Sequence, residues 1–211
     1  MRKLICLFSL LFSLPAFAGA QRYEPLSASV QAVLHQTVSD SAAPRLAFSS
    51  QTEAYSWLAE MSRRLEKRIP DKVVRIDFLK TVHYEATRAG LDPQMVLGLI
   101  QVESGFKKYA VSSAGARGYM QVMPFWVSQI GVPDQNLFHL RTNLRYGCTI
   151  LRHYLDIEKG DLYRALGRYN GSLGRPEYPN MVVGAWRNRW SYPEKINSAA
   201  ANGKARPAAA S

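Results

Sequence analysis

Cysteine is almost missing from this sequence, which carries Cys6 and Cys148 alone in 211 residues. Cys6 lies in an apolar leader, so export would leave Cys148 as the single thiol. One thiol cannot close an internal disulfide, and the fold must therefore be held together by its apolar core. Cys148 falls on the apolar face of a predicted helix, which favours an inert core thiol over a catalytic one.

Acidic residues are in the minority, since 16 Asp and Glu face 27 Lys and Arg and leave a formal charge of +11. Such an excess favours a polyanionic partner. The sequence has no recognisable nucleic-acid-binding motif and carries an export signal, so no nucleic acid is expected. A peripheral contact with an anionic cell envelope fits better. The alternative is that the basic surface only keeps the protein soluble.

Metal-ligand spacing is absent. The four histidines, His35, His83, His139 and His153, are scattered along the chain. A zinc site needs ligands at short, regular intervals. The sequence therefore predicts no metal site and no cofactor.

Long hydrophobic runs are missing after the first twenty residues. The chain starts with the basic Met1-Arg2-Lys3, continues with an apolar run from Leu4 to Pro15, and reaches the small-x-small signal Ala16-Phe17-Ala18. This order predicts a secretory signal peptide over residues 1–18, with cleavage after Ala20 as the alternative. The apolar run is too short for a comfortable membrane span. We therefore expect an exported, periplasmic protein.

No stretch alternates apolar and polar residues convincingly, so no β-strand is predicted. Apolar residues recur instead every three or four positions, which is typical of helices packed on a core. The fold class is mostly α. The predicted helices cover residues 29–37, 51–69, 72–90, 93–104, 125–130, 141–157, 162–169 and 178–190.

The predicted helix over 93–104 holds an unusual acid. Asp92 suits its N-cap, Pro93 its first position and Gly105 its end. On a helical wheel Glu103 falls inside the apolar arc, whereas Gly98 falls opposite. Burial and the negative end of the helix dipole both favour the neutral acid, which a general acid requires. The alternative is a buried ion pair with Lys or Arg.

Motifs after this helix resemble those of a known family. They look like the signature of the soluble lytic transglycosylases of family 1, which are bacterial peptidoglycan-cleaving enzymes with a goose-type lysozyme-like fold. The matching motifs, in the family's order, are Glu103-Ser104-Gly105-Phe106, Ala110-Val111-Ser112, Gly115-Ala116, Gly118-Tyr119-Met120-Gln121-Val122-Met123-Pro124 and Tyr169-Asn170-Gly171.

The resemblance covers about residues 73–190 and implies a division of the chain. Residues 1–18 would be the signal peptide and 19–72 an N-terminal extension with helices. Residues 73–192 would form the transglycosylase SLT catalytic domain, and 193–211 a flexible tail. The sequence departs from the family at Tyr119, Gly171 and Lys107-Lys108, where Leu, Ala and Asn-Pro are usual.

The resemblance also implies roles for six residues. Glu103 matches the catalytic acid and base, Ser112 a serine near the bound muramoyl sugar, and Gln121 and Met123 residues lining the glycan groove. Tyr169 matches a tyrosine that faces the catalytic carboxylate, and Asn170 supports its loop. By sequence alone, Ser112 also suits a turn, and Met123 and Tyr169 suit a plain core.

A single catalytic carboxylate indicates the reaction. A hydrolysing glycosidase normally needs two. A lytic transglycosylase instead cleaves the bond between N-acetylmuramic acid (MurNAc) and N-acetylglucosamine (GlcNAc) without water, leaving 1,6-anhydro-MurNAc ends. The expected partner is the glycan strand of peptidoglycan, and the sequence says nothing about protein partners. The alternatives are a lysozyme-type hydrolase, with Asp134 or Glu177 as second carboxylate, and a non-catalytic peptidoglycan-binding protein.

Overall fold

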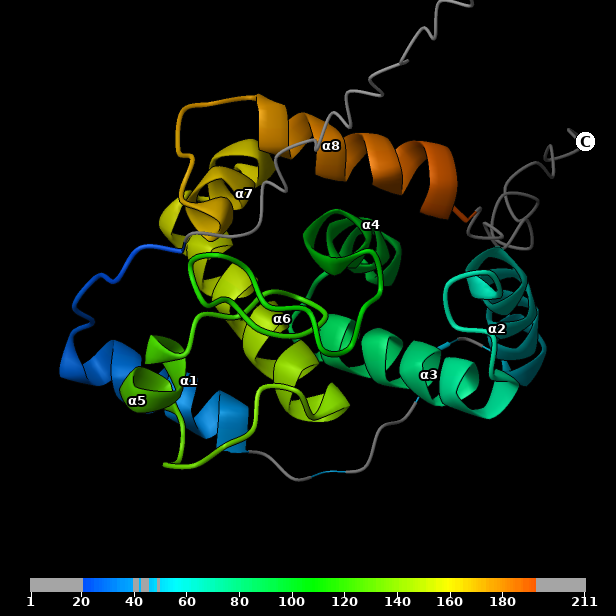
Figure 1. Cartoon of the computed structure of the whole chain (residues 1–211), viewed down its shortest axis with the longest axis horizontal. Coiled ribbons are helices and arrows are strands. Elements are labelled where there is room, and N and C mark those ends of the chain that lie inside the picture. Colours follow the sequence, from blue (N-terminus) through cyan, green and yellow to red (C-terminus); the bar gives the residue numbers. More distant parts are fainter. Residues whose placement is uncertain (1–20, 40–41, 43–45, 49, 193–211) are drawn as a thin grey trace, which may run out of the picture.

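The computed structural model describes residues 21–39, 42, 46–48 and 50–192, and these are mainly helical (Figure 1). Within them no β-strand is present beyond isolated bridges that pair Arg117 with Val111 and Val122. The mostly α fold class is confirmed. The elements are α1 (Ala28–Ser39), α2 (Gln51–Leu65), α3 (Lys72–Arg88), α4 (Pro93–Ser104), α5 (Phe125–Ile130), α6 (Leu140–Ile157), α7 (Leu162–Asn170), α8 (Glu177–Ala185) and the π-helix η1 (Trp186–Trp190).

Two of the predicted segments, the signal peptide over 1–18 and the tail over 193–211, lie outside the described residues. Among the helices that are described, none combines the length and apolar character needed to cross a membrane. Cys148 is buried in α6, and burial raises the pKa of its thiol, in agreement with an inert core residue.

Aspartate side chains cap the starts of three helices, α3, α4 and α7, and of these caps the one at Asp92 was predicted above. Asp71 accepts a hydrogen bond from Val74 N at 2.9 Å at the start of α3. Asp92 accepts from Gln94 N at 2.6 Å and Met95 N at 3.2 Å at the start of α4. Helix α4 ends at Gly105, whose φ of 56° lies in the left-handed region that glycine adopts freely. These local signals fix where the central helix begins and ends.

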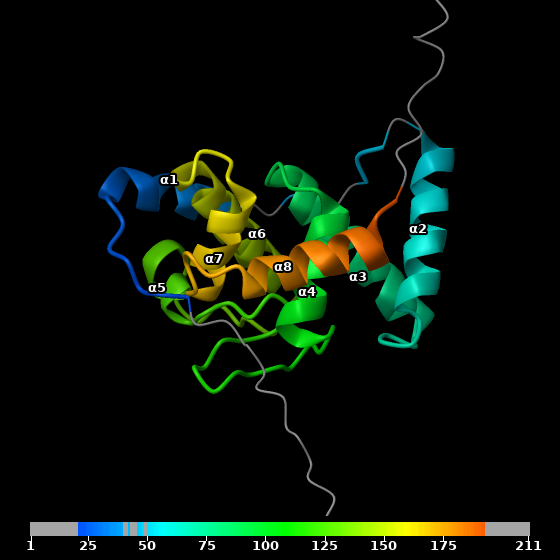
Figure 2. The same cartoon turned by 90° about the horizontal axis from the view of Figure 1, so that it is seen from above.

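Helix α4 is the central element of the fold. It packs against α3, α8 and η1, and its residues 95–100 are all buried. Figure 1 shows α4 between α8 and α3, and in Figure 2 α8 runs across α4 toward α2. The end of η1 reaches α2, where the Arg64 side chain donates to the carbonyl oxygens of Arg189 and Ser191, each at 2.9 Å. Neighbouring helices therefore cover most of α4.

Gly98 allows η1, which follows directly on α8, to lie close to α4. A Cβ at this position would stand 2.8 Å from the backbone nitrogen of Trp186 and 3.1 Å from its Cα. Real Cβ atoms do not approach a backbone so closely without a shift. The arc of α4 that carries Gly98, opposite the apolar arc of the wheel, is therefore a second packing surface.

The helices before residue 73 belong to the same core. Helix α1 packs on α5 and α6, and α2 packs on α3. Trp57, Met61 and Leu65 of α2 are buried in one cluster with the residues of α4. Arg75 holds the turn between α2 and α3, since its guanidinium donates to Ser62 Oγ at 2.8 Å and to Ile69 O at 2.6 Å. These helices share the hydrophobic core that surrounds α4.

Replacing Gly98 with alanine tests the close approach of the two helices. We expect Gly98→Ala to lower the free energy of unfolding by about 1–3 kcal/mol, because the new methyl group meets the Trp186 backbone. Gly184→Ala in α8 is the matched control, since a Cβ there meets nothing within 4 Å. The control should gain about 0.5–1 kcal/mol from helix propensity. Equal urea-unfolding curves for the two variants would contradict the packing argument.

Candidate active site

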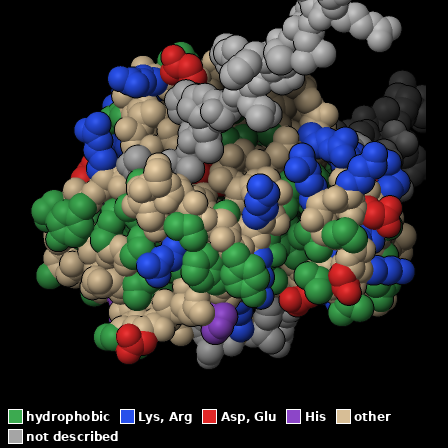
Figure 3. Space-filling model, in the orientation of Figure 1, with side chains coloured by type: hydrophobic (Ala, Val, Ile, Leu, Met, Phe, Trp, Pro, Cys, Tyr) green, Lys and Arg blue, Asp and Glu red, His purple; other side chains and the backbone are tan. Residues whose placement is uncertain are grey.

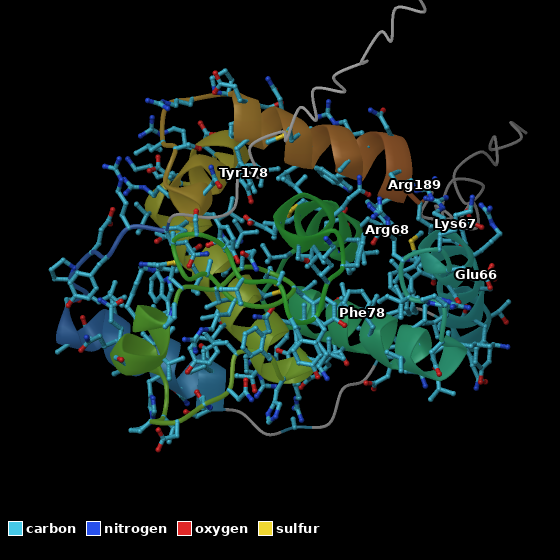
Figure 4. The ribbon with its side chains drawn as sticks, in the orientation of Figure 1. Glu66, Lys67, Arg68, Phe78, Tyr178 and Arg189 are labelled. Carbon is cyan, nitrogen blue, oxygen red and sulfur yellow. The ribbon has the colours of Figure 1, made fainter. Side chains whose placement is uncertain are left out.

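Glu103 lies in the last turn of α4 and is 5% exposed. Its Oε1 accepts a hydrogen bond from the hydroxyl of Tyr178, which is itself buried in the first turn of α8. Figure 4 shows Tyr178 below the first turn of α8, beside α7. The acid thus lies in the interior beside a phenol contributed by a helix that follows far along the chain.

Two tyrosines beside Glu103 keep their protons. Burial raises the pKa of Tyr178 and of Tyr169 well above the ordinary tyrosine value, and the Glu103 carboxylate raises both further. Both phenols are therefore neutral hydrogen-bond donors near pH 7. Tyr178 donates to Glu103, whereas Tyr169 donates to the carbonyl oxygen of Met120 at 2.7 Å.

Tyr178 had no predicted role at the site. The family resemblance implied that Tyr169 faces the carboxylate, but the hydroxyl that donates to Glu103 is that of Tyr178. Tyr178 and Glu103 are 75 positions apart, so no local sequence pattern could predict their contact. The one feature that hints at it is Gly98, a small residue in α4 where another helix can approach.

The loop between α4 and α5 is held by side chains that bind its backbone. Ser104 donates to Tyr119 O at 2.7 Å. Asn143 of α6 accepts from Met120 N at 2.8 Å and donates to Arg117 O at 2.8 Å. The loop is thereby fixed to both α4 and α6. Sequence analysis did not single out Asn143, which is fully buried.

Gln121 and Met123 lie on the part of this loop next to Tyr169. Gln121 is buried with a positive φ of 49°, and its side chain donates to Gly118 O at 2.9 Å and Ala110 O at 3.2 Å. Met123 is partly buried against the core. The Gln121 side chain therefore braces the loop, and its backbone carbonyl faces Gln21.

Ser112 and Asn170 make local contacts. The Ser112 hydroxyl accepts from Ala116 N at 3.0 Å, which closes a turn in the loop. The Asn170 amide donates to Ser172 Oγ at 3.1 Å and so links the end of α7 to the following turn. The structure brings Tyr169 near Glu103, and it places Ser112 and Asn170 in the turns that shape the surrounding loops.

Gln21 is an unexpected member of this cluster. It is 3% exposed, and its amide donates to Gln121 O at 3.3 Å while its Oε1 accepts from Met123 N at 3.2 Å. Its side chain also lies next to the Tyr169 hydroxyl and lowers the pKa of that phenol, against the larger effect of burial. The start of the described chain therefore reaches the same loop backbone as the predicted substrate-binding residues.

Three acids on α6 and α7 have partners of their own. Glu158, 6% exposed, accepts from Arg164 and Arg168, and these hydrogen bonds lower its pKa. Asp156 pairs with Arg152 at 2.6 Å, and Asp161 caps α7. Glu177 is exposed on the first turn of α8, next to Tyr178. The buried carboxyl beside a neutral phenol is the group best placed to give and accept a proton.

Comparisons with known proteins match the region that contains this cluster. Residues 80–179 match the family described as the transglycosylase SLT domain. A transglycosylase of Enterobacteria phage PRD1 is 31% identical over 121 residues, which are 57% of this chain and 42% of the phage protein.

Shorter matches cover the same family of enzymes. Membrane-bound lytic murein transglycosylase C of Actinobacillus pleuropneumoniae serotype 5b (strain L20) is 49% identical over 47 residues, which are 22% of this chain and 13% of the relative. The protein of that name in Haemophilus influenzae (strain PittEE) is 45% identical over a stretch of the same length. The chain thus spans less than half the length of these relatives.

Removing the Tyr178 hydroxyl tests its bond to the buried carboxyl group. We expect Tyr178→Phe to lower the free energy of unfolding by about 1–3 kcal/mol, because a buried oxygen of Glu103 loses a hydrogen-bond donor. The matched control is Tyr163→Phe, because the Tyr163 hydroxyl donates to Asn180 at 3.2 Å on the surface. Its effect should stay within about 0.5 kcal/mol. Urea unfolding that finds equal losses would contradict the bond's importance.

Proposed function

Residues 80–179 form a transglycosylase SLT domain, a lysozyme-like helical fold, and from that premise we propose that this protein is a peptidoglycan lytic transglycosylase. It would cleave the MurNAc-β-1,4-GlcNAc bond without water and leave 1,6-anhydro-MurNAc ends, as in cell-wall remodelling. The observation that carries the proposal is Glu103, a buried acid at the end of α4 with a phenol on its Oε1. A relative that is named a lytic murein transglycosylase supports peptidoglycan as the substrate class.

In this mechanism Glu103 acts twice. Its neutral carboxyl first protonates the glycosidic oxygen, and the bond from that oxygen to C1 of the muramoyl sugar breaks. The muramoyl C6 hydroxyl then bonds to C1, and the Glu103 carboxylate accepts the hydroxyl proton. Atoms balance without water, and Glu103 returns to its starting state.

Tyr178 would position the acid during this cycle. A hydrogen bond donated to the carboxylate stabilises the charged form that exists after the first proton transfer. Because the burial of Tyr178 keeps its phenol neutral, the donor is available throughout. Tyr178 also fixes the direction of the carboxyl group, since its own ring is held in the core.

The other predicted site residues keep their proposed place around the sugar. Gln121 and Met123 would present their backbone to the glycan, and Tyr169 would support that backbone through Met120 O. Ser112 and Asn170 would shape the loops on either side. A hydrolase remains the alternative, and Glu177 is the exposed acid nearest in sequence to Tyr178. Because Glu158, Asp156 and Asp161 have partners of their own, Asp134 and Glu177 stay the candidates for the second carboxylate of a hydrolase.

Basic residues suggest how the protein would lie in the cell envelope. Lys and Arg gather over α2 and the end of η1 in Figure 3, and Figure 4 shows Lys67, Arg68 and Arg189 close together there. These three side chains are exposed, as are those of Arg63 and Arg187. We propose that this basic surface makes a peripheral contact with an anionic envelope after export to the periplasm.

Replacing Glu103 with glutamine tests the proposed reaction. Glu103→Gln keeps the shape of the side chain but cannot transfer a proton, so release of muropeptides from purified cell walls should fall by at least about a hundredfold. Mass spectrometry of wild-type products should show anhydro ends.

Glu177→Gln is the matched control, and its activity should stay close to that of the wild type. A large loss in this control, together with reducing ends in the wild-type products, would favour the hydrolase. Unchanged lysis by Glu103→Gln would leave no enzymatic role for Glu103.

A further inference from the structure

The chain from Gln21 to Leu26, here called the strap, leads into α1 and has an uneven pattern of burial. Gln21 is buried, whereas Arg22, Tyr23, Glu24 and Pro25 are all exposed. The strap is not helical, and Figure 1 shows it running from the neighbourhood of α7 to α1. One inserted side chain thus precedes a run of surface residues.

Few contacts hold the exposed part of the strap. Gln129 donates to Glu24 O at 3.0 Å, and the Glu24 carboxylate lies 3.4 Å from the Arg168 guanidinium. The Tyr23 ring meets Phe125 edge-on with centroids 5.6 Å apart. Glu24 is exposed, and its Arg168 partner is shared with Glu158, so this ion pair contributes little. This part can therefore lift at low cost.

The insertion of Gln21 has a specific chemistry. Its carboxamide presents an N–H to Gln121 O and a C=O to Met123 N. An acetamido group, which peptidoglycan amino sugars carry, has the same donor and acceptor. A sugar that reached these two backbone groups would need the bonds that Gln21 now makes.

The position of these bonds connects them with the proposed active site. Gln21 also lies next to Tyr169, whose pKa is raised by burial and by the neighbouring Glu103 carboxylate. Gln121 and Tyr169 are both almost fully buried in this arrangement, as is Glu103. A glycan chain therefore has to displace a covering segment before it contacts this cluster. The strap is the candidate, because few contacts hold it.

We infer that the strap is an autoinhibitory segment whose Gln21 side chain occupies the place of a substrate acetamido group. Glycan binding and the seated strap exclude one another, so the strap must lift before the enzyme turns over. This inference rests on the proposed function. The strap follows both predicted cleavage sites, so it would stay with the exported chain.

Binding of chitohexaose, in which each sugar carries an acetamido group, tests the inference. The titrations use the full chain with Glu103→Gln, so that no cleavage occurs. Adding Gln21→Ala should tighten the dissociation constant roughly tenfold, the weight of two ordinary buried hydrogen bonds. Gln36→Ala is the matched control, because Gln36 is an exposed glutamine on α1. Its dissociation constant should equal that of Glu103→Gln alone.

A second readout follows the strap itself. Trypsin cleaves after Arg22, and saturating chitohexaose should speed this cleavage in the Glu103→Gln protein by lifting the strap. Equal or weaker binding by Gln21→Ala, no binding at all, or an unchanged cleavage rate would each overturn the inference. The proposed function has a separate test, the digestion of cell walls by the wild-type protein to anhydro muropeptides. Its result does not depend on the chitohexaose titration or on the trypsin cleavage.

Discussion

The close contact of α4 with η1 at Gly98 is the constraint on which the rest of the structure depends. Without a Cβ at this position, the backbone of Trp186 can lie against α4. Helix α8 then runs along α4 and places Tyr178 on the carboxyl group of Glu103. A packing detail in the middle of one helix thus determines the hydrogen bonding of the acid at its end.

A second constraint is the binding of loop backbone by buried polar side chains. Ser104, Asn143 and Tyr169 each bond to the segment from Arg117 to Met120. They come from α4, α6 and α7, so the loop is fixed relative to three helices. A loop that is fixed in this way presents its backbone groups in one arrangement, which reduces the entropy lost on binding a ligand. In the present structure Gln21 binds backbone groups of the same loop, Gln121 O and Met123 N.

Local signals in the sequence predicted much of the fold. The apolar spacing predicted the helices, and the Asp92 side chain caps α4 as expected. Glu103 could be singled out because an acid in an apolar arc is unusual and because the motif after it is specific. These features all lie within a few residues of one another, where sequence patterns are informative.

Contacts between distant residues could not be predicted in the same way. Tyr178 and Gln21 look ordinary in sequence, since one is an aromatic residue in a predicted helix and the other follows the predicted export signal. Their partners lie 75 and 100 positions away, so their roles depend on how the helices pack. On the helical wheel Gly98 lies opposite the apolar arc, on a face that looks exposed. In the structure η1 packs against this face. Sequence spacing does not show which helix will cover such a face.

The central claim is that Glu103 moves one proton twice and that no water enters the reaction. The most direct measurement is digestion of purified cell wall by the wild-type protein in 18O-labelled water, followed by mass spectrometry of the released muropeptides. The account predicts anhydro products with no 18O at the cleaved end. Incorporation of 18O at C1 of the muramoyl sugar would contradict it.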